Sequence, residues 1–204
     1  DLETVALVHP KKHIEQIFSN IPNEGIVGVE KEPYADTMLC PNSKKAILRS
    51  CGAGIAAVDD LMKENERVFC AIRPPGHHAE TSKAMGFCFI NNIAVAARYL
   101  QNKYKVNKIA IIDFDVHHGN GTQEIFYNDE SVAYASSHEY PLFPGTGSSD
   151  EIGVGNIFNA PLKTGMRSKE FLQIFDQKIL RSIDKFKPEV ILISAGFDAH
   201  TRDP

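Results

Sequence analysis

Short, continuous apolar runs alternate along the chain with longer segments whose apolar residues recur every three or four positions. The runs cover residues 68–72, 108–114, 131–136 and 189–194, and they predict strands, of which the one at 131–136 is the weakest. The longer segments cover residues 43–64, 91–104 and 168–186, and they predict amphipathic helices.

The predicted strands are apolar at consecutive positions rather than at alternate ones. A strand of this kind is buried on both faces, as in a parallel sheet that carries helices on each side. The alternation of strands and helices therefore predicts an α/β fold, a three-layer sandwich with a mostly parallel sheet. The sequence contains no internal repeat, low-complexity tract or clear linker, so we expect residues 1–204 to form a single domain.

Composition excludes several classes of protein. The 204 residues are 43% hydrophobic and 24% charged, which is typical of a folded globular chain. A net charge of −4 without a long basic block argues against direct nucleic-acid binding. No apolar run approaches the ~18 residues that a membrane helix requires, and no signal peptide is expected. The four cysteines form no C-x-x-C pair, so we expect a reducing compartment, the cytoplasm, with the nucleus as the alternative.

Polar clusters follow the predicted strands directly, at residues 73–78, 113–123, 136–138 and 196–200. The carboxyl ends of parallel strands share one edge of a sheet, where α/β proteins bind their ligands, so we expect these clusters to converge. They contain six of the eight histidines, all except His9 and His13.

Three residues of the second cluster form a candidate metal site. Asp113, Asp115 and His117 are spaced by two positions, so an extended chain directs them to the same face. Carboxylate and imidazole ligands suit Zn²⁺, with Fe²⁺ as the alternative. Two ligands from one stretch do not hold a metal well, so a third is needed, and Asp198, after another predicted strand, is the best candidate for it. Three protein ligands leave a position open for the water that a catalytic metal activates.

The adjacent residues His77 and His78 are candidates for acid–base chemistry, because neither is needed as a ligand. One can take a proton from a metal-bound water and later give it to a leaving amine, and the other can stabilise developing charge. The remaining histidines of the clusters are expected to be structural or to lie at the rim: His118, His138 and His200.

Five motifs resemble those of the zinc-dependent histone deacetylase family. They are RPPGHH at 73–78, GFCFINN at 86–92, DFDVHHGNGTQ at 113–123, FPGTG at 143–147 and SAGFDA at 194–199. They occur in the family's order at compatible spacing, and they are most similar to its class II-like and bacterial deacetylase-like branch. The resemblance implies an arginase/deacetylase-like fold and zinc-dependent hydrolysis of the acetyl amide of acetyl-lysine in histones or other proteins, with release of acetate.

The resemblance also implies roles for individual residues. The zinc ligands would be Asp115, His117 and Asp198. His78 would be the general base and acid, and His77 its electrostatic partner. Asp113 would orient His77, and Asn120 stands where another branch of the family has an aspartate behind the second histidine.

Further matched positions imply a substrate tunnel and bound monovalent cations. Phe87 and Phe143 would be aromatic walls around the lysine methylenes, and the carbonyl of Gly86 would accept a hydrogen bond from the substrate amide. By residue type alone, such phenylalanines are more often core. A structural potassium ion would be held by oxygens of Asp113, Asp115, His117, Ser136 and Ser137. A second cation would lie near the carbonyls of Phe126, Asp129 and Val132.

The sequence departs from the family pattern at its ends. The family's transition-state tyrosine lies in a Gly-rich loop downstream of the SAGFDA motif, whereas this sequence ends at Pro204, six residues after Asp198. The domain is therefore expected to be incomplete at both ends, with little activity by itself. Two alternatives stay open: a deacetylase of acetylpolyamines or other small molecules, and a catalytically inert interaction domain. A binuclear manganese ureohydrolase would need more bridging aspartates than this sequence offers.

Overall fold

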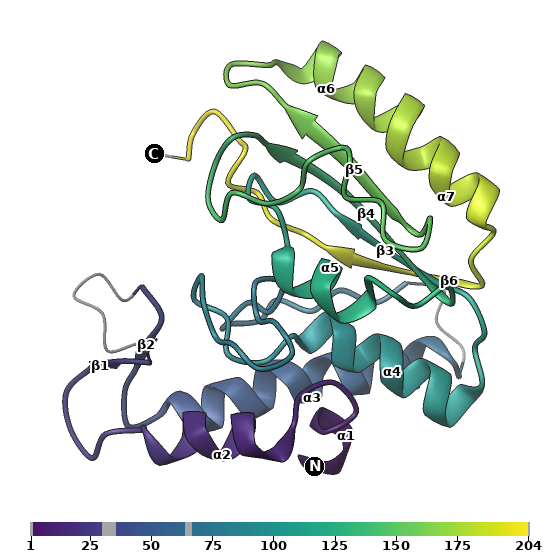
Figure 1. The fold of residues 1–204 in the computed structure, drawn as a ribbon. Coiled ribbons are helices and arrows are strands. Elements are labelled where there is room, and N and C mark those ends of the chain that lie inside the picture. The colour runs from purple at the N-terminus through teal and green to yellow at the C-terminus, as the bar shows by residue number, and fades with distance from the viewer. Residues whose placement is uncertain (1, 30–35, 64–66, 204) are drawn as a thin grey trace. The chain divides into compact units, whose positions relative to one another are not determined.

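The computed structural model describes residues 2–29, 36–63 and 67–203. The chain forms two compact units, Asp1–Lys105 and Val106–Pro204, which are described one at a time. Figure 1 labels the α-helices and strands of both. The prediction that residues 1–204 form a single domain remains a prediction.

The N-terminal unit is mainly helical. Its elements are α1 (Leu2–Val5), α2 (Lys11–Ser19), β1 (Val27–Gly28), β2 (Met38–Leu39), α3 (Ser43–Leu61) and α4 (Asn92–Tyr104). Helices α3 and α4 lie side by side (Figure 1). Helix α4 begins where the side chain of Asn91 accepts a hydrogen bond from the N–H of Ala94, at 3.1 Å, and it ends at Lys105 in the left-handed region. The predicted helix at 91–104 is therefore confirmed.

The helix predicted at 43–64 is also confirmed, as α3, which runs through both of its glycines and ends at Leu61. Residue 64 lies outside the described residues. A Cβ at Gly54 would lie 3.6 Å from the Cβ of Ala96, so this glycine stands at the contact between α3 and α4.

The strand predicted at 68–72 is wrong, because residues 67–72 have no regular secondary structure. The segment lies along α3, where the thiol of Cys70 donates to the carbonyl of Ala53 at 3.6 Å, and Phe69 is 75% exposed. Apolar composition alone does not distinguish a buried strand from an extended segment on a helix. The cluster at 73–78 consequently follows no strand.

The C-terminal unit contains a parallel four-stranded sheet in the order β5-β4-β3-β6. The strands are β3 (Ile109–Asp113), β4 (Val132–Glu139), β5 (Ile157–Leu162) and β6 (Val190–Ser194). The predicted strands at 108–114, 131–136 and 189–194 are thus confirmed, and so is the α/β class with a parallel sheet. The strands β3 and β4 are buried on both faces as expected. β6 is an edge strand among the described residues and exposes Ile191 and Ile193, so burial on both faces is wrong for it.

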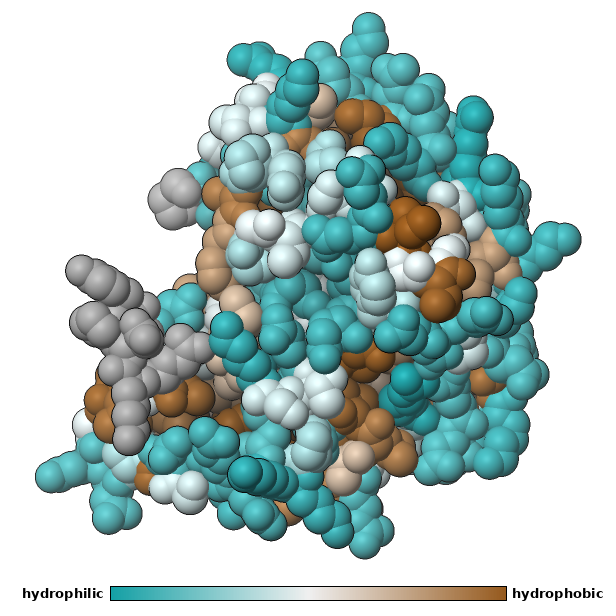
Figure 2. Space-filling view, in the orientation of Figure 1, coloured by the Kyte–Doolittle hydropathy of each residue, from teal (hydrophilic) through white to brown (hydrophobic). Residues whose placement is uncertain are grey.

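One face of this sheet is covered by the helical segment predicted at 168–186. It consists of α6 (Ser168–Ile174), the π-helical η1 (Phe175–Leu180) and α7 (Arg181–Phe186), which run along the sheet in Figure 1. Ile179 and Ile183 are buried against the small side chains of Ala110, Ala133 and Ala135. The outer side of the segment is mostly hydrophilic in Figure 2, as an amphipathic helix requires.

Two elements of this unit were not predicted. Strand β5 contains Asn159 and Pro161, which weaken its apolar pattern. Proline is tolerated there because β5 is an edge strand among the described residues, where an N–H is not needed for pairing on the free side. Helix α5 (Asn120–Phe126) begins inside the polar cluster at 113–123, for which no helix was predicted.

Candidate metal and catalytic site

The carboxyl ends of β3, β4 and β6 bring three of the four polar clusters to one edge of the sheet. Asp113, the last residue of β3, is paired in register with Ser136 of β4 and with Ser194 of β6. The segments that continue from β3 and β6 carry the remaining candidate ligands. The expected convergence is therefore confirmed for these clusters, whereas the cluster at 73–78 belongs to the N-terminal unit.

The structure brings together the three residues proposed from the sequence as metal ligands. Ligand atoms of Asp115, His117 and Asp198 all lie within 4.8 Å of one another. The Nδ1 of His117 is 3.0 Å from Oδ1 of Asp115 and 3.0 Å from Oδ2 of Asp198. Asp198 is held in place by the N–H of Val116, which donates to its Oδ1 at 2.9 Å. Two carboxylates thus converge on one imidazole nitrogen.

This arrangement strongly shifts the pKa values of His117 and Asp198. Hydrogen bonds to Asp115 and then to Asp198 raise the pKa of the His117 imidazolium to about 10, although partial burial opposes the charge. Burial alone would raise the pKa of Asp198, but hydrogen bonds from His117 and from the N–H of Val116 lower it to about 2. A proton therefore lies between two carboxylates at neutral pH, where a divalent cation could replace it.

Gly196 allows the segment after β6 to pass directly beside the carboxylate of Asp115. A Cβ at this position would overlap the carboxylate of Asp115. The glycine of the SAGFDA motif is therefore required by close approach, since any side chain would displace a candidate ligand.

Asp113 lies beneath these residues and is completely buried. Its Oδ1 accepts from the N–H of Asp115 at 3.2 Å, and its Oδ2 accepts from the hydroxyl of Tyr134 at 3.1 Å. The same hydroxyl accepts from the N–H of Gly119 at 3.1 Å. Burial raises the pKa of Tyr134 well above its usual value, so the hydroxyl remains a donor. One tyrosine thus connects β3, β4 and the start of α5.

The loop that carries Phe143 is fixed by residues that the sequence analysis did not identify. Phe143 is 42% exposed, and its ring meets that of His117 edge-on, with 6.2 Å between the centroids. The carboxylate of Glu151 accepts from the N–H groups of Gly147 and Ser148, each at 3.0 Å. The side-chain amide of Gln123 also donates to this carboxylate. Nothing in the sequence pattern distinguishes Glu151 from a solvated acidic residue, because its partners are main-chain groups and one distant glutamine.

Two of the histidines assigned as structural also support this loop. His118 contacts the hydroxyl of Thr146 at 2.7 Å, and His138 contacts the carbonyl of Gly147 at 2.9 Å. Burial lowers the pKa of His138, so it stays neutral at neutral pH. These contacts agree with the structural role expected for both histidines.

In the N-terminal unit, His77 and His78 are buried, and their ring centroids are 4.0 Å apart. Gly86 has a φ of 56°, and a Cβ there would overlap the ring of His78. Phe87 follows with a φ of 66°, which is unusual for a residue with a side chain, and is 62% exposed. The loop around Gly86 is thus packed closely against His78.

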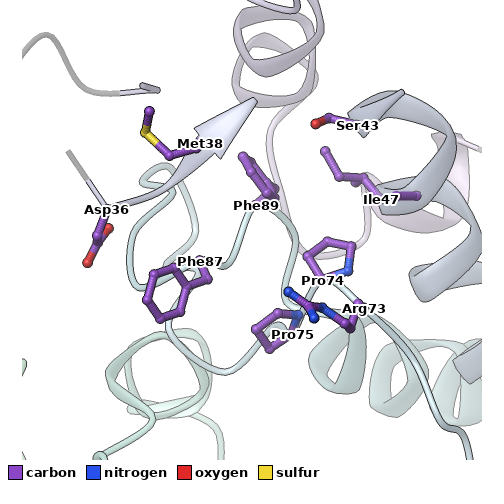
Figure 3. A pocket seen from close by; sticks show the side chains of 10 residues that line it. Asp36, Met38, Ser43, Ile47, Arg73, Pro74, Pro75, Phe87 and Phe89 are labelled. Carbon is purple, nitrogen blue, oxygen red and sulfur yellow. The ribbon is translucent and has the colours of Figure 1, made fainter. Parts of the chain in front are cut away.

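Phe87 borders a pocket of about 340 Å³ that the sequence analysis did not foresee. Its walls include Phe89 and the prolines of the RPPGHH motif, and Figure 3 shows these side chains around the cavity. The N–H of Phe87 donates to the hydroxyl of Thr37 at 3.1 Å, and that hydroxyl donates to Asp36 at 2.8 Å. These contacts fix the strained residue at the mouth of the pocket.

Two of the expected pairings join residues of different units. Asp113 and Asn120 lie in the C-terminal unit, whereas His77 and His78 lie in the N-terminal unit. Asn120 is buried at the start of α5, with its N–H donating to the carbonyl of His118 at 2.9 Å. The roles of Asp113 and Asn120 beside the histidine pair therefore remain predictions.

The whole chain is similar to known proteins. The family model of the histone deacetylase domain matches residues 1–204. The chain is 40% identical to histone deacetylase 10, chloroplastic, of Oryza sativa subsp. japonica, over 100% of this chain and 48% of the rice protein. It is 39% identical to a probable deacetylase of Archaeoglobus fulgidus, over 100% of this chain and 56% of the archaeal one. The chain thus spans about half the length of these relatives.

A solved structure agrees with the fold. The crystal structure of the HDA15 HD domain superposes with a TM-score of 0.92 at 35% identity, and the match covers 99% of this chain and 60% of that one. The arginase/deacetylase fold expected from the sequence is thereby confirmed.

Proposed function

The chain belongs to the histone deacetylase family, and from this premise we propose that it contributes the metal site and the histidine pair of a zinc-dependent lysine deacetylase. The substrate would be the acetyl amide of acetyl-lysine in histones or other proteins, and the products acetate and free lysine. The observation that carries the proposal is the convergence of Asp115, His117 and Asp198.

The donor set fits a catalytic zinc ion. Two carboxylates and one imidazole nitrogen are suitable ligands, and three protein ligands leave room for water and substrate. When bound, zinc would polarise the acetyl carbonyl and lower the pKa of a water molecule. Two local features support this assignment. The main-chain N–H of Val116 holds the carboxylate of Asp198, and Gly196 leaves room for the carboxylate of Asp115. The same donors accept Fe²⁺, so the metal bound by the native protein decides between the two.

The proposed proton transfers use the histidine pair. His78 would take the proton of the attacking water and deliver it to the leaving lysine amine, while His77 supports the charge that develops. Burial of both rings and the close packing of Gly86 against His78 support this assignment, because they restrict the ring to one orientation. A fixed orientation is what a general base requires for efficient transfer.

Substrate contacts are proposed for the two exposed phenylalanines. Phe87 and Phe143 are 62% and 42% exposed, which supports walls of a binding site over core packing. Exposed apolar rings suit the methylenes of a lysine side chain. The carbonyl of Gly86 would accept from the substrate amide, and an acetylated protein or peptide is the proposed partner.

A structural potassium ion is proposed at the end of β3. Its donors would include Asp113, whose carboxylate is completely buried, and Ser136, whose hydroxyl is buried beside His138 at 2.8 Å. The other proposed donors are main-chain oxygens of Asp113, Asp115, His117 and Ser137. A buried carboxylate surrounded by hard oxygen donors favours such a cation.

The compartment is proposed as cytoplasmic, with the nucleus as the alternative. Among the described residues, no helix has the length and apolarity needed to cross a membrane. The rice relative carries the word chloroplastic in its name.

Acetate release by the full-length, zinc-loaded protein tests the proposal. An acetyl-lysine peptide should be hydrolysed by the wild type, and His78→Ala and Asp198→Ala should each remove nearly all of that rate. The matched control is Asp203→Ala, which removes an exposed carboxylate and should keep the wild-type rate. Hydrolysis at an unchanged rate by the metal-free protein would refute the mechanism, and a preference for an acetylated diamine would favour the small-molecule alternative.

A further inference from the structure

Three main-chain carbonyls of the C-terminal unit surround the side-chain amide of a buried asparagine. Asn156 Nδ2 donates to the carbonyls of Phe126 at 2.8 Å, Asp129 at 3.0 Å and Val132 at 2.8 Å. The sequence resemblance assigned these same carbonyls to a second monovalent cation. An ion coordinated by all three would occupy the volume that the amide nitrogen fills, so the described residues do not fit a cation there.

The surrounding contacts determine which end of the amide faces the carbonyls. Asn156 Oδ1 accepts from the N–H of Val154 at 3.2 Å. With the amide reversed, its oxygen would face three acceptors and its NH₂ group would face an N–H donor. Only the observed orientation pairs donors with acceptors at every contact.

The residues next to Asn156 in the sequence also fix the position of its side chain. Gly153 has a φ of 57°, and a Cβ there would lie 2.6 Å from Oδ1 of Asn156. The N–H of Val154 is within 3.2 Å of the carbonyl of Tyr127, and the carbonyl of Asn156 accepts from the N–H of Tyr134 at 3.0 Å. The turn before β5 is thus attached to the end of α5 and to β4, with Asn156 only 3% exposed.

We propose that the amide of Asn156 takes the place of the second monovalent cation. Its two N–H groups supply the positive charge density that three converging carbonyl dipoles require. Because the amide is attached to the chain, the connection between α5 and β4 is stabilised without an ion. The stabilisation at these three carbonyls therefore requires neither potassium nor sodium, and this inference does not depend on the proposed catalytic function.

Crystals of the full-length protein grown with rubidium chloride test the proposal, because the anomalous signal locates Rb⁺. The wild type should show no rubidium at the carbonyls of Phe126, Asp129 and Val132. Rubidium coordinated by these carbonyls, with the Asn156 side chain displaced, would overturn the proposal. The wild-type crystal decides the question even if a variant fails to fold.

The variant Asn156→Ala removes the amide and leaves the three carbonyls buried around a small cavity. Crystals of this variant should show a rubidium ion at this position. If no rubidium is found there, the amide and the ion do not compete for one site, which would contradict the proposal. In solution, thermal unfolding is compared in potassium chloride and in tetramethylammonium chloride at equal ionic strength. The potassium-specific increase in Tm should be larger for Asn156→Ala than for the wild type or for the exposed control Asn102→Ala, and equal increases would contradict the proposal.

Discussion

The buried side chain of His9 should make the stability of the N-terminal unit depend on pH. Its ring is completely buried, with Nε2 accepting from the N–H of Asn91 at 2.9 Å and Nδ1 3.1 Å from the carbonyl of Thr81. The N–H of Asn91 requires an unprotonated Nε2, so the neutral ring is the form that fits. Burial, assisted by the neighbouring His13, lowers the pKa of His9 from 6.5 to about 4.

The depressed pKa makes the free energy of unfolding depend on pH. Between pH 6.5 and about 4 the unfolded chain binds a proton at His9 and the folded chain does not, so acidification favours unfolding. The full difference between the two pKa values corresponds to about 3 kcal/mol in the free energy of unfolding. About 2 kcal/mol of this stability is lost between pH 7.5 and pH 5. The contribution of neutral His9 to the free energy of unfolding is complete above pH 6.5, and it is lost as the pH falls from there through the folded-state pKa of about 4.

Urea unfolding of the full-length protein at pH 7.5 and pH 5 measures this loss. His9→Gln keeps an acceptor and a donor but does not titrate, so the wild type should lose about 2 kcal/mol more than this variant on acidification. The exposed control His200→Gln should behave like the wild type. Parallel losses in wild type and His9→Gln would refute the reasoning, because the histidine would then titrate alike in both states.

Three further substitutions test local features. Gly196→Ala should weaken zinc binding at least tenfold in a chelator competition, because the added methyl overlaps Asp115, and an unchanged affinity would refute the close approach. Gly52→Ala should raise the free energy of unfolding by about 1 kcal/mol, since the glycine is inside α3 with no atom within 4 Å of the new methyl, and a loss of stability would contradict this. Thr37→Val should cost about 1–3 kcal/mol in unfolding experiments, because it leaves the N–H of Phe87 without its acceptor, and a neutral effect would show that this contact does not hold the loop.

The sequence predicted the elements whose apolar residues follow a simple pattern. The runs at 108–114 and 189–194 became neighbouring parallel strands, and the polar residues after them reached the same edge of the sheet. Asp115, His117 and Asp198 could be grouped because strand ends and alternate spacing are both visible in the sequence.

The remaining features depend on contacts that a single sequence does not display. The run at 68–72 has the composition of a strand, but the structure leaves it beside α3 without a strand partner. Strand β5 was missed because its proline is tolerable only at an edge. Asn156 binds main-chain groups, and Glu151 binds main-chain groups together with Gln123; main-chain partners leave no residue-type signature.

The central claim is that Asp115, His117 and Asp198 form one metal site, and metal content tests it most directly. Mass spectrometry of the purified full-length protein should find about one zinc per chain in the wild type, most of it lost in Asp198→Ala and retained in the control Asp203→Ala. A wild type without zinc or iron, or an Asp198→Ala variant with undiminished metal, would contradict the three-residue site.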